Sequence, residues 1–169
     1  MEGKCSFRSA TRADTGLILE FIRELASYEH MEDQVRATET MLEHELFDRN
    51  GAEVLFVMGD DGKEAGFALF FHNFSTFEGR PGIYLEDLFV KPQYRGRGYG
   101  RALMRRLAAI ALERGCARFE WCCLNWNKPS IAFYSSLGAR PMDVWTTWRL
   151  DGSGLRDLVD GKGPGSAGN

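Results

Sequence analysis

The alternation of apolar and polar positions along the chain predicts ten elements in the order β-α-α-β-β-β-α-β-α-β. Apolar residues recur at helical spacing from Leu17 to Leu25, where Asp14 is positioned to cap the helix, and again after Thr38. Short apolar runs between turn residues predict strands at 4–9, 52–58, 64–74, 83–90, 118–124 and 143–150. A strand, a helix and a strand after Tyr84 predict a parallel crossover beside an antiparallel meander. The pattern therefore predicts an α/β fold, with a mixed sheet and helices on both faces.

A glycine-rich turn precedes the most regular of the predicted helices. Gly96, Gly98 and Gly100 alternate with Arg95, Arg97 and Tyr99, and a helix is predicted from about Tyr99 to Arg114. Its apolar face would be Leu103, Met104, Leu107, Ile110 and Ala111, with Gly115 as its stop. Unpaired N–H groups at a helix start bind anions, and glycine lets the backbone come close. The turn therefore predicts a phosphate site, although the glycines alone also fit a plain flexible turn.

The overall composition is that of a single globular domain. The chain has 169 residues, of which 44% are hydrophobic and 27% charged. Glycine becomes frequent after Leu150, so we expect one domain over residues 1–150 and a mobile tail over 151–169. The net charge of −3 argues against nucleic acid as a partner, and no apolar run or leader pattern indicates a membrane or secretion.

The cysteines and histidines lack the spacing of a metal site. None of the four cysteines forms a C-x-x-C pair, and no two of the three histidines have ligand spacing, so no metal is expected. Cys122 and Cys123 are adjacent in an apolar run, so we expect them on opposite faces of a strand as small buried side chains. A reducing cytoplasmic location follows from this cysteine usage.

Four blocks of sequence carry a resemblance to a known family. The run V-x-x-x-Y-R-G-R-G-Y-G after an apolar strand resembles the acetyl-CoA-binding signature of the GNAT superfamily of N-acetyltransferases. The blocks LASYEHMEDQV, YLEDLFV and WNKPSIAFYSSLGA are similar to stretches of its diamine (spermidine/spermine) branch, and the likeness spans about residues 4–150. It implies that the arm of acetyl-CoA lies between the strands YLEDLFV and RFEWCCL. The cofactor-binding residues it implies are Leu88, Phe89, Val90, Arg95, Gly96, Arg97, Gly98, Tyr99, Gly100, Asn127 and Ser130.

Two consecutive carboxylates interrupt the strand YLEDLFV. Strand interiors disfavour acidic residues, so the presence of Glu86 and Asp87 suggests a specific role. In a regular strand their side chains would face opposite sides of the sheet, unless a bulge intervenes. The resemblance implies that Glu86 binds a cation and acts as the base, directly or through water. It also implies that Tyr134, one turn after Ser130, protonates the sulfur of coenzyme A. Salt bridges for the two acids, and a core position for Tyr134, are the alternatives left open.

Further acidic residues point to a small cationic amine as the acceptor. Tyr28 and Glu29 bring an aromatic ring and a carboxylate together, and Glu120 is another candidate contact, although a solvated acidic loop is equally compatible. Thr146 and Thr147 stand where the diamine branch has acids, which favours a small diamine or a lysine-like amine such as thialysine over a long polycation. The resemblance also implies a homodimer. A protein N-acetyltransferase and a non-catalytic acyl-CoA sensor remain the rival functions.

Overall fold

The computed structural model describes residues 5–162, which form two compact units that meet in sequence at Cys122 and Cys123. The first unit contains a five-stranded sheet in the order β1-β2-β3-β4-β5, in which β4 and β5 are parallel and the other pairs antiparallel. Its strands are β1 (Phe7–Ser9), β2 (Glu53–Met58), β3 (Glu64–Ser75), β4 (Arg80–Val90) and β5 (Arg118–Trp121). Its helices are α1 (Thr15–Tyr28), α2 (Glu39–Glu43), which continues into a π-helical turn at His44–Asp48, and α3 (Tyr99–Glu113). The predicted mixed sheet is confirmed.

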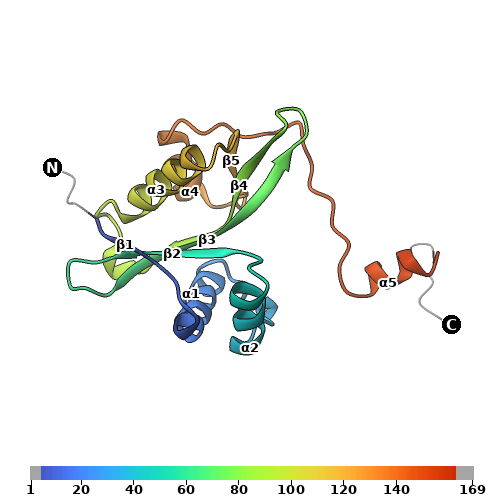
Figure 1. The fold of residues 1–169 in the computed structure, drawn as a ribbon, viewed down its shortest axis with the longest axis horizontal. Coiled ribbons are helices and arrows are strands. Elements are labelled where there is room, and N and C mark those ends of the chain that lie inside the picture. The colour runs from blue at the N-terminus through green and yellow to red at the C-terminus, as the bar shows by residue number, and fades with distance from the viewer. Residues whose placement is uncertain (1–4, 163–169) are drawn as a thin grey trace. The chain divides into compact units, whose positions relative to one another are not determined.

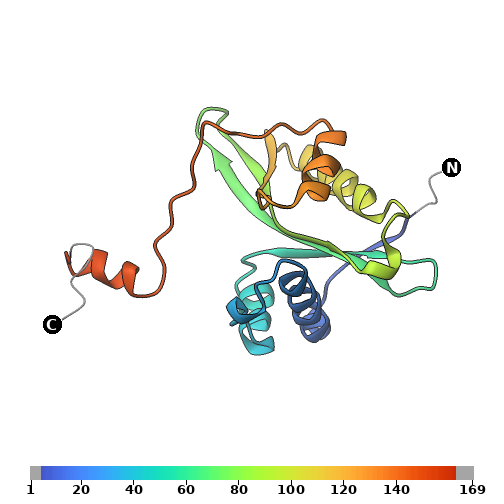
Figure 2. The same ribbon diagram turned by 180° about the vertical axis from the view of Figure 1, so that it is seen from behind.

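Helices cover both faces of this sheet. α1 and α2 lie against one face and α3 against the other, as Figure 1 and the reverse view in Figure 2 show. We call these the α1 face and the α3 face. On the α1 face, Phe21 of α1 is fully buried, and its ring centroid lies 5.0 Å from that of Phe67 and 6.5 Å from that of Phe89. Each such side chain contributes roughly 2–3 kcal/mol by leaving water, so these contacts hold α1 against β3 and β4.

The α3 helix follows the sequence prediction closely. Its buried residues include all five that were predicted, together with Tyr99. Gly115 adopts φ +67°, the left-handed conformation that ends a helix and that glycine reaches without strain. The helix and its stop were predictable because both depend on residues that are close in sequence.

A β-bulge lies at Glu86. Leu69 of β3 pairs with Asp87, but the next residue, Phe70, pairs with Leu85, so Glu86 has no partner on β3. Cross-strand partners share a face of the sheet, and Leu69 and Phe71 share the α1 face. Because Phe71 pairs with Tyr84, the bulge places Tyr84 and Asp87 on one face although they are three residues apart.

Three expectations need correction. Residues 143–150 form no strand, because a strand needs a neighbour to pair with, and Val144 and Trp148 are 89% and 91% exposed. The predicted strand over 118–124 ends at Trp121, which leaves Cys122 exposed rather than buried. Asp14 precedes α1 but does not cap it, because its carboxylate accepts hydrogen bonds from both terminal nitrogens of Arg8 and from Thr11.

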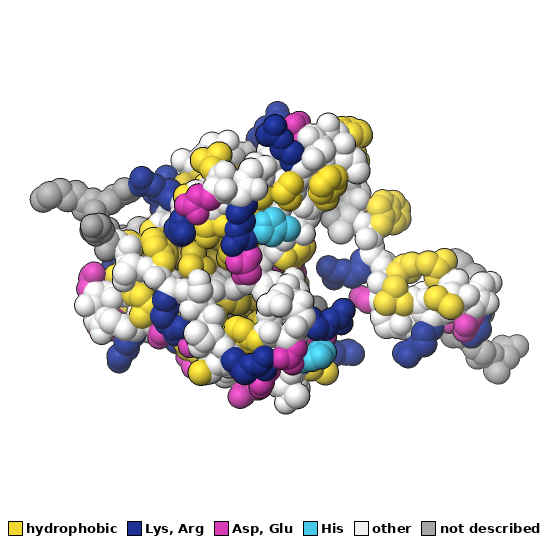
Figure 3. Space-filling model, viewed as in Figure 1, with side chains coloured by type: hydrophobic (Ala, Val, Ile, Leu, Met, Phe, Trp, Pro, Cys, Tyr) yellow, Lys and Arg dark blue, Asp and Glu magenta, His cyan; other side chains and the backbone are white. Residues whose placement is uncertain are grey.

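The second unit contains two short helices, α4 (Lys128–Ser136) and α5 (Ser153–Val159). α4 begins with Pro129 in its first turn and ends before Gly138, which has φ +83°, as the sequence predicts. α5 includes most of the predicted helical turn in LRDLVD, and hydrophobic side chains gather on it (Figure 3). The predicted mobile end GKGPGSAGN lies mostly outside the described residues. Within residues 5–162 no helix is long and apolar enough to cross a membrane.

Candidate active site

The second half of β4 has an open edge. The amide of Lys91 donates to the carbonyl of Ala65 on β3 (2.9 Å), so residues 87, 89 and 91 exchange hydrogen bonds with β3. The N–H and C=O groups of Leu88 and Val90 therefore point to the opposite edge. The recorded pairing of β4 with β5 ends at Leu85 and Trp121, before it reaches these residues. Phe89 is different, since its side chain is buried in the core on the α1 face.

The glycine-rich turn leads from this edge into α3. Gly96 and Gly98 have φ +75° and +85°, and an added Cβ at either would meet no atom within 4 Å. Glycine is therefore required there by backbone conformation, and the space around the turn is open. The first hydrogen bond of α3 runs from the amide of Ala102 to the carbonyl of Gly98. The amides of Tyr99 and Gly100 precede it and so have no acceptor within the helix.

Two residues that the sequence did not single out anchor this turn. The Tyr94 hydroxyl donates to the Asp61 carboxylate (2.7 Å), which lies in the turn between β2 and β3. The Tyr94 ring also meets the Tyr99 ring edge-on, with centroids 6.1 Å apart. Tyr94 is buried and therefore fixes the entrance of the turn against the sheet. Its place just before the glycines was the only signal in the sequence.

The Arg95 side chain is held away from the turn. Its Nε donates to the carbonyl of Val90 (2.9 Å), and its guanidinium carbon lies 4.9 Å from the centroid of the Tyr28 ring and 5.2 Å from that of Phe89. Both contacts are of the cation–π type. The structure thus brings together two predicted site residues, Tyr28 and Arg95, and directs Arg95 toward the end of α1. The side chain of Arg97 is exposed.

Three predicted carboxylates form an acidic cluster: Glu29 at the end of α1, and Glu86 and Asp87 on β4. The pKa of Asp87 is raised to about 7, mainly because the carboxylate is buried and to a smaller extent because Glu86 and Glu29 are negatively charged. Burial also raises the pKa of Glu29. Glu86, the bulge residue, is exposed. Crowding of like charges in a partly buried place destabilises the cluster, and a cationic ligand would relieve this repulsion.

Tyr84 lies on the same face as Asp87 and was missed by the sequence analysis. Its hydroxyl lies 3.0 Å from the Sγ of Cys122, and its ring centroid lies 5.2 Å from that of Phe71. Burial, the contact with Cys122 and the nearby charges of Glu86 and Glu120 all raise the pKa of Tyr84. Tyr84 therefore connects the acidic cluster to Glu120. Its position two residues before Glu86 was visible, but its shared face with Asp87 required the bulge.

Glu120 has close partners of its own. Its Oε2 accepts a hydrogen bond from Nδ2 of Asn73 (3.0 Å) and lies 2.8 Å from Nε of Arg118. A terminal nitrogen of Arg118 donates to the carbonyl of Phe74 (3.1 Å). Glu120 is thus not a lone carboxylate, and part of its charge is compensated within the first unit.

The remaining predicted residues belong to the second unit. The buried Asn127 side chain caps α4 by accepting a hydrogen bond from the amide of Ser130 (3.2 Å). Tyr134 follows one turn later and is half-buried, with its ring centroid 5.3 Å from that of Phe133. The expected spacing of Ser130 and Tyr134 on one helix is therefore present.

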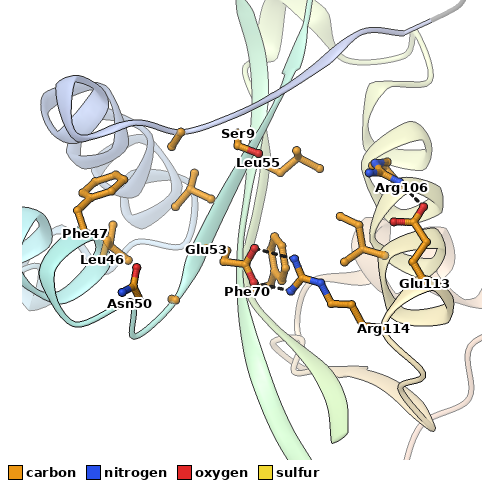
Figure 4. A pocket seen from close by; sticks show the side chains of 14 residues that line it. Ser9, Leu46, Phe47, Asn50, Glu53, Leu55, Phe70, Arg106, Glu113 and Arg114 are labelled. Carbon is orange, nitrogen blue, oxygen red and sulfur yellow. Dashed lines mark hydrogen bonds and ion pairs between the residues drawn. The ribbon is translucent and has the colours of Figure 1, made fainter.

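A pocket of about 320 Å³ lies elsewhere, along β2 and α3 (Figure 4). None of the predicted site residues lines it. Its charged side chains are paired, Arg114 with Glu53 and Arg106 with Glu113, as the dashed lines in Figure 4 show. The pocket therefore has little net charge with which to attract either an anion or a cation.

Comparison with known proteins decides the family. Residues 19–139 match the family model described as "Acetyltransferase (GNAT) family". The chain is a member of the GNAT acetyltransferase family. Thialysine N-epsilon-acetyltransferase of Sus scrofa is 39% identical over 163 residues, covering 90% of this chain and 95% of that protein. Spermidine/spermine N(1)-acetyltransferase-like protein 1 of Homo sapiens is 32% identical and covers 90% of this chain, but only 23% of its own length is matched.

Solved structures share the fold, among them an acetyltransferase of Trypanosoma brucei with a TM-score of 0.67 at 26% identity, covering 88% of this chain and 99% of that one. An integron cassette protein from the mobile metagenome of V. cholerae superposes with a TM-score of 0.76 at 30% identity, covering 94% of this chain and 98% of that one. GNAT acetyltransferases use acetyl-CoA as the acetyl donor. This GNAT chain is therefore an N-acetyltransferase, as its sequence predicted, and it transfers an acetyl group to an amine.

Proposed function

We propose that this enzyme acetylates the primary amine of a small cationic acceptor, with lysine-like amines as the preferred class. The observation that carries the proposal is the acidic cluster of Glu29, Glu86 and Asp87 beside the open edge of β4. A partly buried group of carboxylates attracts a protonated amine and excludes acidic substrates. The similarity to thialysine N-epsilon-acetyltransferase over most of both chains supports the same acceptor class.

The residues around the glycine-rich turn fit acetyl-CoA, which supplies the acetyl group as an activated thioester. Leu88 presents its N–H and C=O groups, and Val90 its N–H group, to the arm of the cofactor along the open edge of β4, while the carbonyl of Val90 accepts from Arg95. The amides from Gly96 to Gly100, with the positive end of α3 and the exposed Arg97, bind the pyrophosphate. The amide of Arg95, which the sequence included in this site, donates instead to the carbonyl of Pro92. Open space around Gly96 and Gly98 supports this placement. Asn127 and Ser130 contribute further contacts to the cofactor.

Two side chains move the protons. Glu86 accepts the proton of the incoming ammonium group, directly or through water, because its bulged position leaves it exposed beside Asp87. Tyr134 donates a proton to the departing sulfur. Tyr28, Glu29 and Asp87 hold the amine, so that the cation is bound before it is deprotonated.

The proposal extends to assembly and location. Val144, Trp145 and Trp148 expose large apolar surfaces in a segment that alternates like a strand, which supports pairing with a second copy as a homodimer. None of the four cysteines, which all lie within residues 5–162, forms a disulfide, and this supports the cytoplasm as the location.

A panel of acceptors tests the proposed function. Release of free thiol from acetyl-CoA is measured with thialysine, spermidine and a short lysine-containing peptide. We expect the highest kcat/KM with thialysine, since the acidic cluster is compact. A higher value with spermidine would assign the enzyme to polyamines, and acetylation of the peptide alone would make it a protein acetyltransferase. No thiol release with any amine would contradict the proposal and favour a sensor.

A further inference from the structure

A pair of opposite charges stands on β5, on the same face of the sheet as Tyr84 and Asp87. Arg118 pairs with Gly82 of β4, and Glu120 pairs with Tyr84. Residues two apart on a strand share a face, so Arg118 and Glu120 both project from the face that carries Tyr84. We call Arg118 and Glu120 the head-group pair. β5 lies beside β4, as Figure 1 shows, so this pair and the acidic cluster occupy one continuous surface of the first unit.

The head-group pair presents both charges without neutralising either completely. Arg118 shares the Oε2 of Glu120 with Asn73, while the other oxygen of Glu120 has no recorded partner within the described residues. The Arg118 side chain is 38% exposed and Glu120 35%. Guanidinium carries five N–H groups, of which contacts with Glu120 and Phe74 engage only some. A ligand therefore meets a guanidinium edge and a carboxylate oxygen side by side.

The spacing between the head-group pair and the acidic cluster matches a lysine-like molecule. Tyr84 and Glu120 share one row across the sheet, and Asp87 lies about two regular strand residues further along, or roughly 7 Å. The backbone of Arg118 lies two residues further from Asp87, but its Nε lies 2.8 Å from Oε2 of Glu120, so its guanidinium is at the Glu120 carboxylate. The six bonds from the terminal nitrogen of lysine to its carboxyl carbon span a similar length, roughly 7 Å when extended. A single small molecule can therefore reach both places.

We propose that Arg118 and Glu120 bind, respectively, the α-carboxylate and the α-ammonium of an amino acid whose terminal amine is acetylated beside Glu86. Arg118 pairs with the α-carboxylate and Glu120 with the α-ammonium. A zwitterion satisfies both members of the pair, whereas the second ammonium of a diamine gains from Glu120 and is repelled by Arg118. Arg118 is thus a specificity-determining residue, and this inference rests on the proposed function because it takes the reacting amine to lie beside the acidic cluster.

The experiment compares acceptors that differ by one charged group. Lysine and thialysine carry both head groups, cadaverine is lysine without its carboxylate, and 6-aminohexanoate is lysine without its α-ammonium. For Arg118→Gln we expect kcat/KM to fall about 10- to 100-fold with lysine and thialysine, the loss of a hydrogen bond to a charged group. With cadaverine we expect kcat/KM to rise, because Glu120 is released from its cation.

Two further variants separate binding from structure. Arg118→Lys keeps the charge and should retain more lysine activity than Arg118→Gln, and melting temperatures show whether each variant folds. Glu120→Gln should reduce the advantage of lysine over 6-aminohexanoate, since only lysine carries the α-ammonium.

Equal losses of kcat/KM with lysine and cadaverine in Arg118→Gln, or no change with either, would overturn the inference. A wild-type enzyme that acetylates cadaverine as well as lysine would overturn the inference but leave the proposed function standing. A wild-type enzyme that acetylates no amine would refute the proposed function itself.

Discussion

Glu86→Gln is expected to lower kcat with a cationic amine by about 100- to 1,000-fold, the usual contribution of a general base. The loss should be greatest at mildly acidic pH. There the amine is almost fully protonated, and without Glu86 it must lose its proton to a much weaker acceptor. At high pH free amine is more abundant, so the variant should approach the wild type. The pH profile of kcat between pH 6 and 9.5 measures this, and a ratio of wild type to variant that is constant across the range would contradict the role of base.

Asp87→Asn is the matched control, since it removes the adjacent carboxylate. With a pKa of about 7, Asp87 is largely neutral below pH 7 and charged above it. Asp87→Asn should therefore raise KM for the amine above pH 7 and have little effect on it below pH 7.

The same substitution should change the pH dependence of stability. Because folding raises the pKa of Asp87, ionisation of Asp87 opposes folding. The wild type should thus lose stability relative to Asp87→Asn as the pH rises from about 4 through 7.

Tyr134→Phe is expected to lower kcat by about 100-fold while affinity for coenzyme A is retained, because only the proton donor is removed. The half-buried ring keeps its packing beside Phe133 in this variant. Steady-state rates of thiol release, together with calorimetric binding of coenzyme A, separate the two effects. Ser135→Ala, an exposed change on the same helix, is the control and should behave as the wild type. A Tyr134→Phe enzyme with undiminished kcat would remove this residue from the mechanism.

The parts of the fold that depend on local sequence were predictable. α3 and its stop at Gly115 follow from apolar spacing and one glycine, and the glycine-rich turn follows from the conformations that Gly96 and Gly98 adopt. The segment over 143–150 shows the limit of such reasoning. Alternation of apolar residues describes a strand only when another strand is available to pair with it, and the sequence does not reveal that partner.

The site depended more on contacts between distant segments. Glu29, Glu86 and Asp87 could be named as candidates because acids in apolar strands and beside aromatic residues are conspicuous. The sequence allowed a bulge at Glu86 but could not establish it, because the bulge arises from a one-residue register shift against β3. The contacts of Arg95 with Tyr28, of Tyr94 with Asp61 and of Arg118 with Glu120 join residues that no local pattern links.

The proposed site for coenzyme A is tested most directly by titrating the ¹⁵N-labelled protein with coenzyme A and following the amide resonances. We expect saturable shifts at Gly96, Gly98 and Gly100, where α3 begins, and at Leu88 and Val90 on the open edge of β4. Pantetheine, which lacks the phosphates, should shift Leu88 and Val90 but not the three glycines. Shifts confined to the pocket around Arg106 and Arg114, with the glycine amides unmoved by coenzyme A, would contradict it.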